Sequence, residues 1–194
     1  MKRLLMACAA AALLAACGTP ARLDYYTLTA QDTVRGALPD AGALKIYVGP
    51  VTIPEGVDRP QMVVRTSPNQ VRIEDLDRWA EPLKAAIPRL AAETLARRLA
   101  PSDVMTSRQS ATLDFDFRVA LDIDRFDFSA GEGAAVDATW TIRGAKSSAA
   151  RTGHTRAREP AGGGDPQAMA AAQSRAIEKV AGDIAEAIRA LSRP

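Results

Sequence analysis

The sequence predicts an α+β fold, a two-layer sandwich in which two amphipathic helices cover a mainly antiparallel sheet. Three observations support this prediction. Apolar residues occupy alternate positions over 113–123, as in a strand with one buried face. An apolar stripe with helical spacing runs from Met169 to Leu191. The elements follow the order strands, helix, strands, helix, and two helices with one apolar face each need a sheet to cover.

The first residues have the layout of an export signal that ends at a cysteine. A basic start, Met1–Arg3, precedes an apolar stretch from Leu4 to Leu14. The run Leu14-Ala-Ala-Cys17 matches a lipobox, in which the thiol is joined to a diacylglycerol before lipoprotein signal peptidase cuts ahead of it. We expect residues 1–16 to be removed, 17–24 to form a lipidated tether and 25–194 to form one domain.

This segment has other possible interpretations. Cys17 as an ordinary thiol behind a plain signal peptide is the alternative, whereas Cys8 has too little apolar sequence before it. A membrane-spanning helix needs ~20 apolar residues, and the apolar run stops at Gly18. Gly18 is also not the aspartate that retains enteric lipoproteins at the inner membrane, which favours the outer membrane.

The composition excludes several classes of function. The 25 Lys and Arg residues include Lys2 and Arg3 of the signal, so the mature chain balances its 23 Asp and Glu residues. A neutral chain offers no bulk charge for nucleic acid or anionic lipid. Both cysteines lie at or before the cleavage site, so the mature domain has neither a disulfide nor a cysteine metal site.

The first half of the chain predicts short strands followed by a helix. Strands are expected at 25–28, 44–49, 61–65 and 71–75, with a hairpin turn at 67–70 and a loop at 30–43. Pro50 and Pro54 restrict the continuation of the second strand to an edge or a bulge. A helix is expected from about Asp77 to Pro101, kinked or split at Pro88.

The second half predicts three strands and a helix. The alternation over 113–123 shifts by one residue near Arg125, which predicts a β-bulge there. The turn at 131–133 leads to an antiparallel partner over 136–142, and a more polar strand is expected at 149–158. Asp165 followed by Pro166 is a typical helix start, because aspartate caps the helix and proline fits its first position.

No set of residues in the sequence matches a known catalytic motif. Nucleophile-elbow, phosphate-loop and zinc-protease patterns are absent. The single histidine, His154, lies in a polar run and is expected to be exposed. The carboxylates Asp122, Asp124 and Asp127 beside the predicted bulge resemble acid–base or calcium ligands, but a solvated strand face is the simpler explanation.

Two polar segments are better candidates for function. One is Asp58-Arg-Pro-Gln61 between strands, and the other is Arg78-Trp-Ala-Glu-Pro-Leu83 at a helix start. Arginine and tryptophan are favoured interface anchors. We therefore predict a partner-binding surface formed by Asp58, Arg59, Gln61, Arg78, Trp79 and Glu81. The alternative is structural, with Asp58 capping a turn and Trp79 buried.

These segments, with Cys17, Tyr25-Tyr-Thr-Leu28 and Ile46-Tyr-Val-Gly-Pro-Val-Thr-Ile-Pro54, resemble the PqiC-like family of ABC-type transport auxiliary lipoproteins. The resemblance implies a periplasm-facing, non-catalytic lipoprotein with no cofactor beyond the N-acyl diacylglycerol of Cys17. It implies work beside an Mce-domain protein in transport of lipids or other hydrophobic molecules between the two membranes, with ring-like self-association.

Two other classes of function stay open on the sequence. The first is a structural or assembly lipoprotein that supports a barrel protein or the envelope without transport. The second is a periplasmic hydrolase, which would need a nucleophile and a base that the sequence does not present.

Overall fold

The computed structural model describes residues 21–31, 43–106, 114–145 and 150–192. They form one eight-stranded mixed sheet and two helices, which confirms the predicted α+β class. The strands are β1 (Asp24–Tyr26), β2 (Leu44–Thr52), β3 (Gln61–Ser67), β4 (Gln70–Trp79), β5 (Ser102–Met105), β6 (Phe117–Ser129), β7 (Gly133–Gly144) and β8 (Ala150–Glu159). The helices are α2 (Leu83–Arg98) and α3 (Pro166–Leu191), and η1 (Glu55–Val57) is a short 3₁₀ turn.

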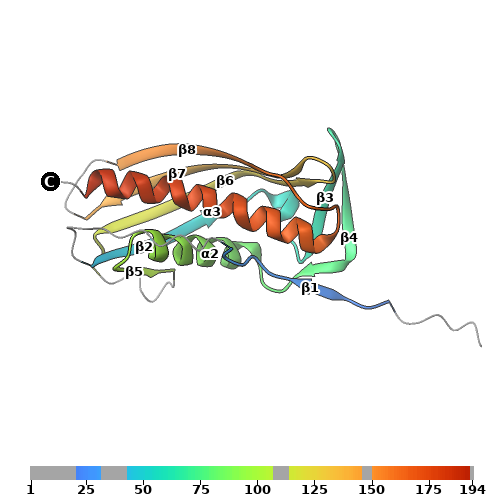
Figure 1. Ribbon diagram of the computed structural model, residues 1–194, viewed down its shortest axis with the longest axis horizontal. Coiled ribbons are helices and arrows are strands. Elements are labelled where there is room, and N and C mark those ends of the chain that lie inside the picture. The colour runs from blue at the N-terminus through green and yellow to red at the C-terminus, as the bar shows by residue number, and fades with distance from the viewer. Residues whose placement is uncertain (1–20, 32–42, 107–113, 146–149, 193–194) are drawn as a thin grey trace, which may run out of the picture.

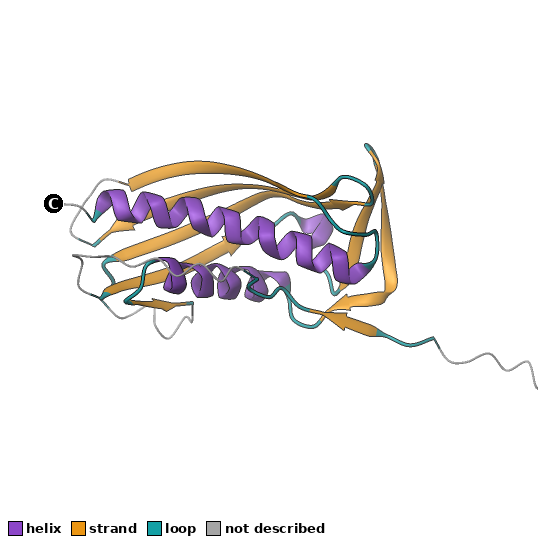
Figure 2. Ribbon diagram, viewed as in Figure 1, coloured by secondary structure: helices purple, strands orange, loops and turns teal. Residues whose placement is uncertain are grey.

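Both helices lie on the same face of the sheet, so the molecule has the predicted two layers (Figure 2). Helix α2 packs on β2 and β5, and α3 packs on β6, β7 and β8. The core between the layers includes Ile46, Val119, Val136, Leu90 and Ile184, all fully buried. Within the described part of the chain, neither helix combines the length and apolar character needed to cross a bilayer.

Strand β6 is the central strand of the sheet, since it pairs with β7 on one edge and with β2 and β3 on the other. It pairs antiparallel with β7 along its whole length, and β7 pairs antiparallel with β8. Its other edge pairs in parallel with β2 and, at Ser129, with Arg65 of β3. The hairpin β3–β4 stands crosswise at one end of the molecule, and β1 pairs in parallel with β4 there (Figure 1). The antiparallel ladders are the longer ones, as expected.

The predicted bulge is present in β6. Ile123 pairs with Ala138 and Arg125 with Asp137, so Asp124 is the extra residue. The buried positions accordingly change from odd to even, from Val119, Leu121 and Ile123 to Phe126 and Phe128. The bulge therefore keeps one apolar face on the core along the whole strand while re-aiming the charged side chains beside it.

Helix α3 begins as predicted. Asp165 accepts a hydrogen bond at Oδ1 from the backbone N–H of Ala168 at 2.9 Å, and Pro166 occupies the first helical position. The stripe Met169, Ala172, Ala176, Ile177, Val180, Ile184 and Ile188 is buried, whereas Leu191 is exposed. An aspartate cap and an apolar stripe are sufficient local signals for this element.

The predicted start of the first helix near Asp77 is wrong. Strand β4 continues to Trp79 because it pairs with β1 as well as β3, and the helix begins at Leu83. Pro82 is the residue before the helix rather than part of its first turn. Of the kink or split expected at Pro88, the split is wrong, since α2 is a single helix that contains Pro88. Proline there removes only one backbone hydrogen bond, and burial of the apolar side chains around it holds the helix together.

The remaining predictions differ in outcome. The proline-rich end of the second strand forms a bulge between Val48 and Val51 rather than an edge, because β2 is paired on both sides. Strand β5, which follows Pro101, was not predicted. The expected loop at 30–43 and the start of the strand at 113 fall mostly outside the described residues, as does Cys17. Strand β1 begins at Asp24, the last residue assigned to the predicted tether.

The segment after β1 is fastened to the C-terminal helix. The backbone N–H of Thr29 donates to Ser174 Oγ at 3.1 Å, and that of Gln31 donates to Glu178 Oε1 at 2.8 Å. Leu28, the residue before Thr29, is fully buried, and its carbonyl accepts a hydrogen bond from Arg89 at 2.8 Å. The N-terminal segment is therefore an integral part of the two-layer core.

Candidate functional site

The fold brings together the two polar segments that the sequence singled out. Gln61 at the start of β3 pairs with Arg78 near the end of β4. The backbone N–H of Trp79 donates to the carbonyl of Pro60 at 2.7 Å. Because β4 continues to Trp79, the residues that precede α2 lie directly beside the residues that precede β3.

A cleft of about 400 Å³ opens between these segments, and we call it the tryptophan cleft. It is lined by Asp58, Arg59, Pro60, Trp79, Ala80, Glu81, Pro82 and Leu83. Trp79 is only 6% exposed and lies against Phe126, with 6.4 Å between the ring centroids. The structural alternative therefore holds for Trp79, which supports the cleft from the core and offers little surface to a partner.

The acidic residues of the cleft are held by basic residues of α2. Lys84 Nζ lies 2.6 Å from Asp58 Oδ2, and Arg89 donates to Glu81 Oε1 at 2.6 and 3.0 Å. The hydrogen bond to Glu81 raises the pKa of Arg89 above its ordinary value. The roles of Lys84 and Arg89 could not be predicted from the sequence, because a paired charge on a helix surface looks the same as a solvated charge until its partner is known.

The two arginines of the predicted surface, Arg59 and Arg78, are less engaged in contacts within the protein than Asp58 and Glu81 are. Arg59 is exposed, and in the described part of the chain its guanidinium has no hydrogen-bond or ion-pair partner. Arg78 makes one long hydrogen bond, from Nε to the carbonyl of Asp75 at 3.4 Å. The cleft thus combines the unpaired charge of Arg59, two acidic side chains that are neutralised by ion pairs, and an apolar floor.

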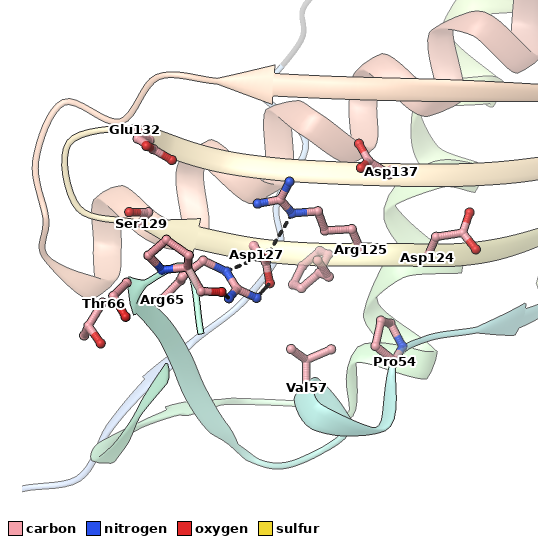
Figure 3. Close-up of a pocket in the computed structure, with 13 residues that line it drawn as sticks. Pro54, Val57, Arg65, Thr66, Asp124, Arg125, Asp127, Ser129, Glu132 and Asp137 are labelled. Atoms are coloured by element: carbon pink, nitrogen blue, oxygen red, sulfur yellow. Dashed lines mark hydrogen bonds and ion pairs between the residues drawn. The ribbon is translucent and has the colours of Figure 1, made fainter. Parts of the chain in front are cut away.

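A second, wider hollow of about 910 Å³ is lined in part by Pro54 and Val57, the residue before η1 and its last residue (Figure 3). Arg65 from β3 and Arg125 from β6 both point at Asp127 there, with their Nε atoms 2.9 and 2.7 Å from Asp127 Oδ2. Asp127 is mostly buried, which favours its neutral form, but the hydrogen bonds and charges of the two arginines outweigh burial and lower its pKa. This ion-pair group ties the crosswise hairpin to the main sheet.

The aspartates beside the bulge do not converge on a metal. Asp122 accepts from Thr52, Asp124 accepts from Thr139 at 3.1 Å, and Asp127 is bound by two arginines. Among the described residues, no group of three or more His, Cys, Asp and Glu side chains is placed to hold a metal ion. The interpretation as a charged outer face therefore fits better than the calcium or acid–base one.

His154 lies on β8 and is exposed, as predicted. Its ring nitrogens lie 3.2 Å from Arg156 Nε and 3.4 Å from Thr139 Oγ1. Its polar neighbours are a threonine and an arginine, neither of which polarises an imidazole as a carboxylate would.

We expect Asp127→Asn to lower the free energy of unfolding at pH 7 by about 1–2 kcal/mol, because two arginines lose their charged acceptor. The folded-state pKa of Asp127 lies below its ordinary value. Its stabilising effect is therefore complete above about pH 4 and is lost as the pH falls through the folded-state pKa. Urea unfolding of both proteins at pH 7 and at pH 3 should show the difference shrinking with acid.

Asp124→Asn is the matched control, since Asp124 is exposed and its recorded partner is a threonine hydroxyl. We expect a small difference from the wild type that does not vary with pH. An Asp127→Asn protein as stable as the wild type at pH 7 would show that the hairpin does not depend on this ion-pair group.

Comparison with known proteins gives the family. The family model described as "ABC-type transport auxiliary lipoprotein component" matches residues 26–185, which covers the whole sheet except the first residues of β1, both segments of the tryptophan cleft and most of α3. The chain belongs to this family. It is therefore an auxiliary lipoprotein component of an ABC-type transport system, a protein of the bacterial envelope.

Solved structures of similar fold support the assignment of the architecture. The crystal structure of an uncharacterized protein aligns with a TM-score of 0.66 and 18% identity, covering 86% of this chain and 99% of the other. Protein XCC0632 from Xanthomonas campestris, of the DUF330 family, aligns with a TM-score of 0.65 and 18% identity, covering 87% and 97%. At this identity the likeness concerns the fold alone. No curated protein matches the sequence.

Proposed function

We propose that this auxiliary lipoprotein is a PqiC-like docking component of an Mce-linked ABC-type system that moves lipids or other hydrophobic molecules between the inner and outer membranes. Its role is binding rather than catalysis. Cys17 carries the N-acyl diacylglycerol anchor, and Gly18 favours the outer membrane, with the domain facing the periplasm. The proposal includes ring-like self-association, which native mass measurement of the detergent-solubilised protein would test.

One observation carries the proposal. The two segments that bear the PqiC-like resemblance are separated by strands β3 and β4, yet they line one cleft. Arg59 projects there without a partner in the described residues, while Asp58 and Glu81 are already paired. An unpaired arginine beside an apolar cleft floor is a suitable contact for an acidic or carbonyl-rich segment of a partner protein.

We expect Arg59→Glu to reduce capture of the Mce-domain partner by roughly tenfold without changing the fold, because an exposed attractive charge becomes a repulsive one. Arg143→Glu is the matched control, since Arg143 is an exposed arginine at the far end of β7. Co-purification from solubilised membranes, normalised to the amount of lipoprotein, measures the effect. Equal losses for both variants would contradict a specific role for the cleft.

The partner itself is tested by photo-crosslinking in intact cells. A crosslinking amino acid at Pro60, on the edge of the cleft, should capture an Mce-domain protein, and the same group at Arg143 should not. Capture of a barrel-assembly or lipopolysaccharide-export protein instead would favour the structural and assembly alternative and overturn the transport proposal.

A further inference from the structure

The exposed apolar side chains of this protein are gathered in one place. Among the described residues, the large apolar side chains that are at least 40% exposed are Leu23, Tyr25, Val71, Ile73, Leu76 and Leu191. All except Leu191 lie on β4 or on β1 and the residue before it. Single exposed apolar residues are ordinary on a protein surface, whereas their concentration on two paired strands marks a contact surface.

The register of β1 and β4 explains how these side chains share a face. Tyr25 pairs with Arg78, and the next pair is Tyr26 with Trp79. Trp79 is in the core, and the Tyr26 hydroxyl donates to Asp77 at 3.0 Å, so this pair faces inward. Side chains two positions apart in a strand share a face. Leu23 and Leu76 therefore lie with Tyr25 on the outward face, which we call the anchor-side patch.

The hairpin carries two further exposed apolar side chains. Val71 and Ile73 pair with Arg65 and Val63 of β3, and both are exposed near the hairpin end. Figure 1 shows β1 and the crosswise β3–β4 hairpin at the same end of the molecule, opposite the C-terminal end of α3. The described chain enters the fold at this end.

We propose that the anchor-side patch and the hairpin rest on the lipid bilayer that holds the acyl chains. This inference rests on the proposed lipidation of Cys17. Only Gly18–Arg22 separate Cys17 from Leu23, and a chain of that length spans at most about 20 Å. An apolar surface held that close to a bilayer contacts it in preference to water, and tyrosine is favoured at the membrane interface.

The charges around the patch favour an apolar contact with the membrane over an electrostatic one. Arg22 lies 3.4 Å from Asp24, and Arg72 lies 2.7 Å from Glu74. Both pairs are neutral, so Arg78, which pairs with Tyr25 and has no ion-pair partner among the described residues, leaves a single positive charge beside the patch. One charge is too few to make the contact depend on anionic lipid headgroups. The contact is therefore made by leucine, isoleucine, valine and tyrosine side chains at the level of the headgroups, and it should occur on zwitterionic lipid and persist in high salt.

The mature protein allows a direct test by single-cysteine labelling. With Cys8 removed and Cys17 acylated, an introduced cysteine is the only free thiol. Tyr25→Cys, Ile73→Cys and the control Arg151→Cys, at the start of β8, would each carry an environment-sensitive dye. The full lipidated proteins are reconstituted into phosphatidylcholine vesicles with and without doxyl-labelled phosphatidylcholine.

We expect the doxyl lipid to quench the dyes at 25 and 73 several-fold more than the dye at 151, with a blue-shifted emission at both positions and no change in high salt. Equal quenching at all three positions would overturn the inference. Dyes at 25 and 73 that respond to protein density but not to doxyl lipid would show that a second copy covers the patch, which also overturns it.

Flotation of the vesicles separates this inference from the proposal on which it rests. Protein that floats without quenching at 25 and 73 retains its anchor but not the bilayer contact. Protein that fails to float lacks the anchor, and both statements are then wrong.

Discussion

Cys17→Ser should abolish incorporation of fatty acid and leave a precursor that migrates more slowly than the mature protein. The hydroxyl of serine cannot receive the diacylglycerol thioether, and lipoprotein signal peptidase cuts only after that transfer. Each buried methylene of an acyl chain contributes ~0.8 kcal/mol to membrane binding, so loss of all chains removes the anchor completely. Metabolic labelling with an alkyne fatty acid, followed by electrophoresis, measures both effects.

Cys8→Ser is the matched control, because Cys8 lies inside the proposed signal peptide and is the only other cysteine of the printed sequence. This variant should be labelled and processed as the wild type is. If Cys17→Ser still reaches the mature size and stays with the membrane, Cys17 is an ordinary thiol behind a plain signal peptide.

Gly153→Ala should lower the free energy of unfolding by about 2–4 kcal/mol, the upper range for overpacking a core. A Cβ at Gly153 would lie 2.2 Å from Cζ2 of Trp140, on the neighbouring strand β7. Trp140 cannot move freely, because its Nε1–H donates to Thr155 Oγ1 at 3.1 Å and Thr155 donates to Asp183 at 2.7 Å. One methyl group would disturb a chain of contacts that links β7, β8 and α3.

Urea unfolding of the mature protein measures this effect, with Gly162→Ala as control. Gly162 has open space around its Cβ position and no unusual backbone angle, so its replacement should change the free energy of unfolding by less than about 0.5 kcal/mol. In a Trp140→Leu background the added cost of Gly153→Ala should largely disappear. A full cost there would mean that the clash with the indole is not the cause.

The elements that the sequence predicted well are those with a local physical cause. The odd-to-even shift of apolar residues around Arg125 located the bulge of β6 correctly, and Asp165 with Pro166 located the start of α3. The error at Asp77 has the opposite origin. The residues after Asp77 fit helical spacing, but pairing with β1, which lies far away in the chain, holds them in a strand. Strand β5 was missed for the same reason, since its partner β2 is remote.

The candidate site likewise has features with a local cause in the sequence and features that depend on remote parts of the chain. Its two segments were recognisable from residue types and from a family resemblance, and the fold places them on one cleft. The partners Lys84 and Arg89, and the group of Arg65, Arg125 and Asp127, were not predictable. Each of these ion pairs depends on strands or helices that meet only in the folded molecule.

The fastening of the N-terminal segment to α3 has a mechanical consequence. Any pull between a membrane and a periplasmic partner would enter this domain through β1. Because β1 runs parallel to β4, its ladder bonds would be loaded together in shear rather than opened one after another. Behind them, the buried side chain of Leu28 and the hydrogen bonds from Thr29 to Ser174 and from Gln31 to Glu178 carry the load into α3. A domain built in this way keeps its shape under tension.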